Sequence, residues 1–131
     1  MKIGLFSTMI CTDKMQKVKD FYIKNFGAKL AFDSEWYKIL EFSNPNQSLH
    51  LMGSNPEFPA ANGQGLGLNM QVDDVDAEYK RLMDNKCTIA MPIEDHDWGD
   101  RGFSILDPGG VSVYIYTPKP PSEEFAKCYK S

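Results

Sequence analysis

One order of predicted elements occurs twice along this chain, and that repeat restricts the possible fold more than any other feature of the sequence. In the first half, an apolar segment is followed by an amphipathic segment and then by three short alternating segments; these span 3–11, 14–26, 28–34, 37–42 and 48–52. Hydrophobic residues three and four apart predict a helix, whereas strict alternation predicts a strand. The first half is therefore predicted to fold in the order strand, helix, strand, strand, strand.

The second half shows the same order, with equivalent features about sixty residues further along. Its predicted strands span 65–72, 87–94, 102–107 and 111–117, and its predicted helix lies between the first two. The turn sequence Leu-Asp-Pro-Gly-Gly stands where Ser-Asn-Pro-Asn-Gln stands in the first half. One supersecondary unit present twice predicts an α+β protein made of two βαβββ modules.

Capping residues define the ends of the predicted helices. Asp13, followed three residues later by Gln16, has the pattern of a capping box, and Gly27 is placed to end that helix. One of the two aspartates at 73–74 is predicted to cap the second helix, and Ser122 is predicted to cap a short C-terminal helix.

A chain of 131 residues is long enough for one domain with its own core. We therefore predict a single domain over 1–131, containing a first module at 3–52 and a second at 65–117. The segment 53–64 is rich in Gly, Pro and Asn and is predicted to link the modules. The remaining residues, 118–131, form a tail.

The composition excludes some classes of partner. A net charge of -4 argues against a nucleic-acid-binding protein, which would normally carry a basic patch. No apolar run is long enough to span a membrane, so no membrane association is predicted. Three widely spaced cysteines (Cys11, Cys87 and Cys128) favour thiols in a reducing compartment over a disulfide framework, which predicts a cytoplasmic protein.

Three stretches resemble the vicinal oxygen chelate superfamily, which includes glyoxalase I, bleomycin-resistance proteins and extradiol dioxygenases. They are DKMQKVKDFYIKNFGAKL at 13–30, VDDVDAEYKRL at 72–82 and WGDRGFSILDPGG at 98–110. In character the chain is most similar to the metal-free, bleomycin-resistance-like members. The resemblance implies that the modules form a curved mixed sheet with the helices outside and the ligand in a concave cup. It also implies a homodimer.

Strand alternation predicts which side chains face this cup. In segment 65–72, one face is uniformly apolar and suits packing on the helices, whereas Asn69 and Gln71 lie with two glycines on the other face. The small polar face is therefore predicted to line the cup. The same argument, extended through the repeat, gives the cup-facing set Ser7, Met9, His50, Met52, Asn69, Gln71, Tyr114 and Tyr116.

Two further candidates come from the stretch at 98–110. In this family the Trp-Gly loop often flanks the ligand cup, so the resemblance implies that Trp98 stacks on a planar ligand; the alternative is a packed loop aromatic. Arg101 is a candidate to pair with a ligand carboxylate, and its alternative is a structural ion pair with Asp100 or Asp107.

The resemblance also implies where a metal would bind. Metal-dependent members take one His or Glu from the first and last strand of each module, and these positions are Ser7, His50, Gly67 and Tyr114 here. Only His50 is a usual metal ligand, whereas a catalytic divalent site needs about three protein ligands. We therefore predict no metal and no other cofactor. The segment 94–100 is predicted to be a solvated acidic loop that attracts cationic ligands.

These observations predict a protein that binds a small, partly aromatic or cationic molecule, with antibiotic sequestration as the specific form that the resemblance suggests. No catalytic residue is assigned. The alternative is a glyoxalase-like lyase or isomerase, with a displaced metal site or a metal-free mechanism that uses His50 and Tyr114. A third interpretation is a module whose cup serves dimer packing. The sequence does not decide whether the protein is an enzyme, and it does not name the ligand.

Overall fold

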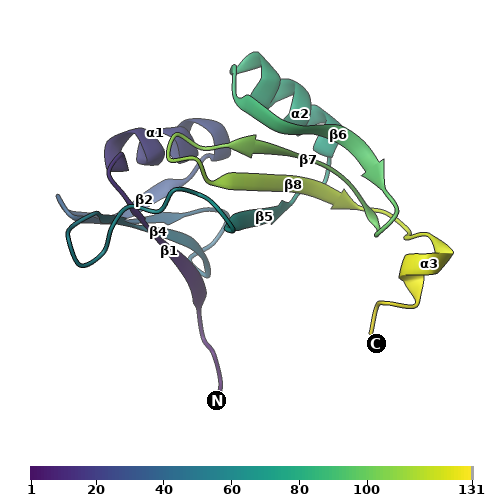
Figure 1. Cartoon of the computed structure of the whole chain (residues 1–131), viewed down its shortest axis with the longest axis horizontal. Coiled ribbons are helices and arrows are strands. Elements are labelled where there is room, and N and C mark those ends of the chain that lie inside the picture. The colour runs from purple at the N-terminus through teal and green to yellow at the C-terminus, as the bar shows by residue number, and fades with distance from the viewer. Residues whose placement is uncertain (131) are drawn as a thin grey trace. The chain divides into compact units, whose positions relative to one another are not determined.

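The computed structural model describes residues 1–130 and contains two four-stranded mixed sheets, each with a helix packed on it (Figure 1). Each half of the chain supplies one sheet, which confirms the predicted α+β class and the two βαβββ modules. Contacts divide the chain into two compact units. Unit 1 is residues 1–64 with 108–110, and unit 2 is residues 65–107 with the chain from 111 onward.

Unit 1 contains the elements of the first module. These are β1 (Phe6–Thr12), α1 (Met15–Phe26), β2 (Lys29–Asp33), β3 (Tyr37–Glu41) and β4 (Gln47–Gly53). The strand order is β1-β4-β3-β2, with β1 parallel to β4 and the other pairs antiparallel. Helix α1 contacts β4, and its Val18 and Tyr22 are buried together with Leu40, Leu49 and Leu51 of the sheet.

Helix α1 does not begin as predicted. The residue before the first turn of α1 is Lys14, and no side chain caps the start of the helix. The predicted capping box of Asp13 and Gln16 is therefore wrong. Strand β1 runs on to Thr12, whose Oγ1 accepts a hydrogen bond from the Lys14 N–H at 3.0 Å. The predicted end is confirmed, because Gly27 adopts a left-handed conformation (φ 64°) and donates its N–H to the Ile23 carbonyl.

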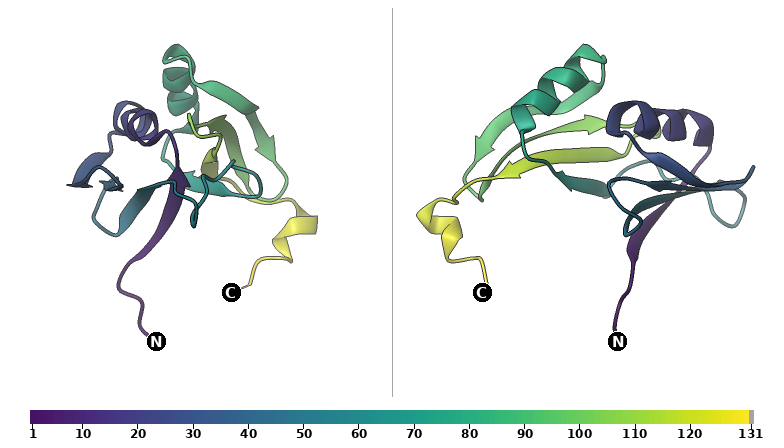
Figure 2. Two further views of the ribbon diagram at one scale, coloured as in Figure 1. Left: turned by 60° about the vertical axis from the view of Figure 1, so that its left-hand side comes forward. Right: turned by 180° about the vertical axis from the view of Figure 1, so that it is seen from behind.

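Unit 2 repeats the arrangement. Its elements are β5 (Gly67–Gln71), α2 (Val75–Asp84), β6 (Thr88–His96), β7 (Asp100–Leu106), β8 (Ser112–Pro118) and α3 (Glu123–Ala126). The strand order is β5-β8-β7-β6, with β5 parallel to β8. Helix α2 contacts β6, β7 and β8, and its first turn is capped by Asp74, whose Oδ1 accepts from the Ala77 N–H at 3.1 Å. Figure 2 shows α1 and α2 each lying against one face of its own sheet.

Burial along the strands confirms the predicted register. In β8, Val113 and Ile115 are fully buried on the side that faces the helix. Tyr114 and Tyr116, which alternate with them, are partly exposed on the opposite face. In β5, Asn69 and Gln71 are exposed and their neighbours are partly buried. A slip of one residue would reverse both patterns.

The segment from 94 to 100 differs from its prediction as a solvated loop. Strand β6 continues to His96 and β7 begins at Asp100, so these two residues pair across a turn of only three residues. Gly99 in that turn has φ 125°, a conformation that side chains disfavour, and it allows the tight reversal. Because the segment is mostly strand, its side chains alternate between two faces of the sheet.

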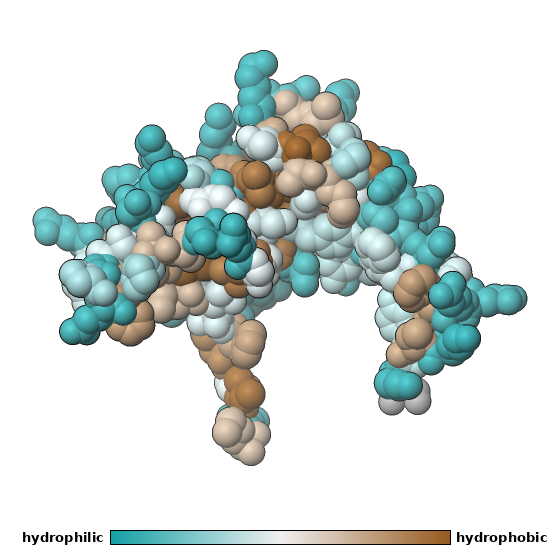
Figure 3. Space-filling model, in the orientation of Figure 1, coloured by the Kyte–Doolittle hydropathy of each residue, from teal (hydrophilic) through white to brown (hydrophobic). Residues whose placement is uncertain are grey.

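Within residues 1–130, none of the helices is both long and apolar enough to cross a membrane. The segment before β1 carries exposed apolar side chains, visible as the brown and tan atoms of the N-terminal extension in Figure 3.

Candidate functional site

Unit 2 contains a cavity of about 340 Å³ on the sheet face that α2 does not cover. The floor comes from β5 and β8, one wall from the β6–β7 turn, and the other wall from the tail after β8. Its lining includes Gln71, Trp98, Asp100, Tyr116, Lys119 and Tyr129. Three of the predicted cup residues, Gln71, Trp98 and Tyr116, are therefore brought together by the structure.

The tail after β8 is fixed against the turn at 97–99 by hydrogen bonds. The Lys119 N–H donates to the Gly99 carbonyl at 2.8 Å, and the Ser122 N–H donates to the Asp97 carbonyl at 2.9 Å. The Tyr129 hydroxyl donates to the Trp98 carbonyl. These contacts hold Tyr129 against the backbone of Trp98, and both residues line the cavity.

The aromatic rings are ordered by contacts among themselves. The Trp98 indole stacks on the His96 imidazole with a centroid distance of 4.1 Å and an interplanar angle of 5°, while Trp98 remains 43% exposed. The Tyr114 and Tyr116 rings stack at 5.6 Å and 18°. One face of the Trp98 ring is therefore occupied, and much of the residue remains accessible to a planar ligand.

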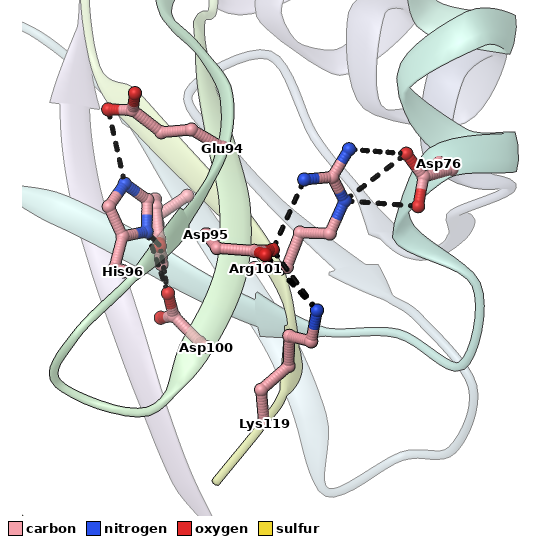
Figure 4. Close-up of polar contacts among 8 residues, drawn as sticks. Asp76, Glu94, Asp95, His96, Asp100, Arg101 and Lys119 are labelled. Atoms are coloured by element: carbon pink, nitrogen blue, oxygen red, sulfur yellow. Dashed lines mark hydrogen bonds and ion pairs between the residues drawn. The ribbon is translucent and has the colours of Figure 1, made fainter. Parts of the chain in front are cut away.

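A buried polar cluster lies beneath the Trp98 ring. His96 Nδ1 lies 2.8 Å from Asp100 Oδ1, and the Tyr114 hydroxyl donates to the same oxygen at 2.8 Å. Because a carboxylate only accepts, His96 carries its proton on Nδ1 in this contact. The Nε2 atom is 3.5 Å from Glu94 Oε1, as Figure 4 shows, and the side chains of His96 and Asp100 are only 7% and 10% exposed.

The phenol of Tyr114 is held in its protonated form. Burial is the main cause that raises its pKa above the ordinary value, and the hydrogen bond and negative charge of Asp100 raise it further. Tyr114 therefore acts as a hydrogen-bond donor to Asp100 at neutral pH. A role of Tyr114 as general base is disfavoured there.

Arg101 lies on the opposite face of β7 from Asp100, because neighbouring residues in a strand point to opposite sides. Its guanidinium binds Asp76 of α2 at 2.9 Å and Asp95 of β6 at 3.2 Å. Asp95 also binds the Lys119 ammonium at 3.2 Å. Figure 4 shows this ion-pair cluster beside the His96–Asp100 contact. Arg101 thus forms a structural ion pair, although with Asp76 and Asp95 in place of the partners considered from the sequence.

This cluster makes stability depend on pH in the acidic range. A hydrogen bond from Arg101 is the main cause that lowers the pKa of Asp76 below 3.8, and hydrogen bonds from Lys119 and Arg101 lower that of Asp95. The stabilisation is therefore present above about pH 4 and is lost as the pH falls through the lowered values. We expect Arg101→Gln to destabilise the protein modestly at pH 7, and the difference from wild type to vanish near pH 2.

Urea unfolding at the two pH values measures this effect. Lys80→Gln removes a positive charge from the exposed side of α2 and serves as the matched control, since the Lys80 side chain makes no hydrogen bond or ion pair within residues 1–130. An Arg101→Gln penalty that persists unchanged at pH 2 would show that the ion pairs are not its source.

The other predicted cup residues lie outside the cavity lining. Ser7, Met9, His50 and Met52 belong to unit 1, on the face of its sheet opposite the buried leucines. There the Tyr37 hydroxyl lies 2.7 Å from His50 Nδ1, and Ser48 Oγ lies 3.4 Å from its Nε2. Asn69 is exposed on β5 of unit 2.

The four positions that the resemblance implies for a metal do not fit one here. Gly67 offers no side chain, the Tyr114 hydroxyl donates a hydrogen bond to Asp100, and the Nδ1 of His50 is engaged with Tyr37. No group of three His, Cys, Asp or Glu side chains suited to a metal occurs among residues 1–130. A divalent ion at those positions would lack the usual three protein ligands.

Sequence reasoning missed four residues: His96, Asp100 and Tyr129, which shape the cavity of unit 2, and Tyr37, which contacts His50 in unit 1. Strand β7 begins at Asp100, two residues before the predicted start at 102, and Asp100 shares a face with Gly102. A predicted strand that began at 100 would have placed Asp100 on that face. The pairing of His96 with Asp100 follows from the three-residue turn. The position of Tyr129 depends on the path of the tail, for which the sequence carries no pattern.

The comparisons with known proteins agree with this architecture. Residues 4–115 match the family model described as the glyoxalase/bleomycin resistance protein/dioxygenase superfamily. No curated protein matches the sequence with significant similarity.

Several solved structures are similar to this chain. TnmS3, an antibiotic binding protein from Streptomyces sp. CB03234, is 27% identical with a TM-score of 0.73, over 91% of this chain and 97% of its own. A glyoxalase/bleomycin resistance protein from the same organism is 25% identical with a TM-score of 0.68, over 86% and 98%. A lactoylglutathione lyase from Agrobacterium tumefaciens is 19% identical with a TM-score of 0.69, over 88% and 94%, and shares the fold.

Proposed function

The chain belongs to the glyoxalase/bleomycin resistance protein/dioxygenase superfamily, and on that basis we propose that it binds a planar aromatic small molecule in the cavity of unit 2. The observation that carries this proposal is the presence of two accessible aromatic residues, Trp98 and Tyr116, in the lining of one cavity of about 340 Å³. That volume lies in the range of about 300–1,000 Å³ that small-molecule sites occupy. The protein would act by stoichiometric capture.

Antibiotic capture is the form of this function that we favour. TnmS3, which is similar to this chain along nearly its whole length, is an antibiotic binding protein. The lyase alternative has less support, because three of the four positions that the resemblance implies for a metal, Ser7, Gly67 and Tyr114, do not carry a usual metal ligand. Gln71 adds an amide that can donate and accept hydrogen bonds at the cavity floor.

Replacing Trp98 with alanine tests the proposal. Aromatic stacking contributes about 0.5–1.5 kcal/mol beyond the buried area, so we expect the dissociation constant for a planar tricyclic probe to rise about tenfold. Acridone, a neutral fluorescent tricycle, is a suitable probe, and anisotropy measures its binding. Trp36→Ala is the matched control because Trp36 is exposed, lies in unit 1 and does not line the cavity. Equal affinities for wild type and both variants would refute the proposed site.

We also propose that the protein is a homodimer. Strands β1 and β5 each pair with one neighbour and form the edges of their sheets, and unpaired edges are favourable places for association. Phe6 on β1 is 79% exposed, and Met9 is also exposed.

The predicted ligand-binding roles of Ser7, Met9, His50, Met52 and Asn69 stay predictions, as does a single domain over 1–131.

Light scattering coupled to gel filtration tests the dimer. We expect a mass about twice the 14.8 kDa of one chain, and we expect Phe6→Lys to shift the mass toward that of one chain because it places a charge at the edge. Ile23→Lys, on the exposed side of α1, is the control and is expected to leave the dimer intact. A mass of one chain for the wild type at all concentrations would exclude the dimer.

A cytoplasmic location is part of the same proposal. It is supported by Cys11 and Cys128, whose thiols donate to the backbone carbonyls of Phe58 and Glu124. Such thiols persist most readily in a reducing compartment.

A further inference from the structure

We propose that the cavity of unit 2 selects positively charged ligands and that Asp100 is the residue responsible. This inference rests on the proposed function and specifies its ligand as a planar aromatic cation. Asp100 lines the cavity, yet its side chain is only 10% exposed, so its carboxylate is largely removed from water. A buried carboxylate interacts more strongly with a nearby charge than an exposed one.

The charge balance of the lining favours a cation. Asp100 and Lys119 are the two charged residues in the lining, and the Lys119 ammonium is bound by both carboxylate oxygens of Asp95, at 3.2 and 3.3 Å. Lys119 is therefore already neutralised by an aspartate that lies outside the cavity lining. Within residues 1–130, the Asp100 side chain contacts the Tyr114 hydroxyl and His96, and His96 is a cation only when both of its ring nitrogens are protonated. With His96 in its neutral form, the cavity is left with a negative charge.

The hydrogen bonds of Asp100 also determine which of its oxygens can serve a ligand. His96 Nδ1 and the Tyr114 hydroxyl both approach Oδ1, so the two donors hold the carboxylate in place. No hydrogen bond to Oδ2 occurs within residues 1–130, and this oxygen is available to accept from an N–H group of the ligand. His96 and Tyr114 are thus positioning residues, and Asp100 is the group that touches the ligand.

The neighbouring rings suit the same class of ligand. Trp98 and Tyr116 line the cavity together with Asp100, and aromatic ring faces attract cations. A planar ring system with a delocalised positive charge and an N–H group would stack on these rings and donate to Oδ2. Protonated aminoacridines and aryl amidinium groups have this chemistry.

Three fluorescent tricyclic probes of similar size test the inference: proflavine, a cation at pH 7.5; acridone, which is neutral; and anthracene-9-carboxylate, an anion. Binding to wild type, Asp100→Asn and Asp97→Asn is measured by anisotropy. We expect wild type to bind proflavine at least tenfold more tightly than acridone, and the anion most weakly. Asp100→Asn keeps an acceptor for His96 and Tyr114 but loses the negative charge, and it is expected to reduce proflavine affinity by at least tenfold more than acridone affinity, so that the preference for the cation disappears.

Asp97→Asn removes a negative charge from the same turn, outside the cavity lining, and is expected to change neither affinity. A cooperative urea-unfolding transition of Asp100→Asn, measured at the same pH, shows that the variant remains folded. If wild type binds acridone and proflavine equally, or if Asp100→Asn keeps the preference for proflavine, charge selection by Asp100 is refuted while the proposed function stands. If none of the probes binds wild type, the proposed function fails and this inference fails with it. If Asp97→Asn abolishes the preference for proflavine to the same extent as Asp100→Asn, the selection comes from the general surface charge, and the proposed role of Asp100 is overturned.

Discussion

Gly102→Ala is expected to lower the free energy of unfolding by about 1–3 kcal/mol, which is the usual cost of overpacking a filled interior. Gly102 is buried in β7 and faces Tyr116 across the β7–β8 pair. A methyl group there would overlap the Tyr114 hydroxyl and would lie 2.9 Å from the backbone carbonyl oxygen of Ile115. The strand backbone cannot move away without breaking its pairing, so Tyr114 would have to leave its position over the glycine.

Gly67→Ala is the matched control for this substitution. Gly67 lies on β5 of the same sheet, and a methyl group there would meet only the Ser112 carbonyl oxygen, at an ordinary 3.7 Å. We expect its unfolding free energy to remain within about 0.5 kcal/mol of wild type. Urea unfolding measures both variants, and equal stabilities would mean that the space above Gly102 is not tightly filled. Displacement of Tyr114 would also release Asp100, so Gly102→Ala is expected to weaken proflavine binding.

The repeat and the strand alternation were sufficient to predict the fold and the sheet faces. Two copies of one element order predicted two βαβββ modules because each unit must bury the apolar face of its helix on its own sheet. Alternation then placed Gln71 and Tyr116 on the face away from α2, where the cavity lies. These predictions succeeded because they depend on local periodicity, which tertiary contacts seldom reverse in well-patterned segments.

The rest of the site depended on features that periodicity does not report. The charged residues Glu94, Asp95 and His96 suggested a loop, but pairing with β7 kept them in a strand and buried His96 against Asp100. Arg101 was considered a ligand-binding residue because it follows the Trp98–Gly99 stretch, which was expected to flank the cup. Neighbouring residues of a strand point to opposite faces, so Arg101 lies on the other face of β7 from Asp100, where it binds Asp76. We therefore propose Asp100, which lines the cavity, as the charged residue of the candidate site in place of Arg101.

Tyr114→Phe is expected to destabilise the protein by about 1.5–3 kcal/mol at pH 7.5, because it removes a hydrogen bond to a buried carboxylate. The Tyr114 hydroxyl donates to Asp100 Oδ1 at 2.8 Å, and without it this oxygen keeps only the His96 contact. Tyr116→Phe is the matched control, since the Tyr116 ring stacks on Tyr114 but its hydroxyl makes no hydrogen bond within residues 1–130. We expect that control to stay within about 0.5 kcal/mol of wild type.

The pH dependence separates this hydrogen bond from a simple packing effect. Burial and Asp100 raise the pKa of Tyr114 above its ordinary value of 10.0, so the folded state keeps a proton that the unfolded chain releases. The stabilisation is therefore complete below pH 10 and declines as the pH rises above it. Urea unfolding of wild type and Tyr114→Phe at pH 7.5 and pH 11 is expected to show the gap between them closing at the higher pH. A gap of constant size would mean that the phenylalanine variant is destabilised by altered packing, and that the Tyr114 proton does not hold Asp100 in place.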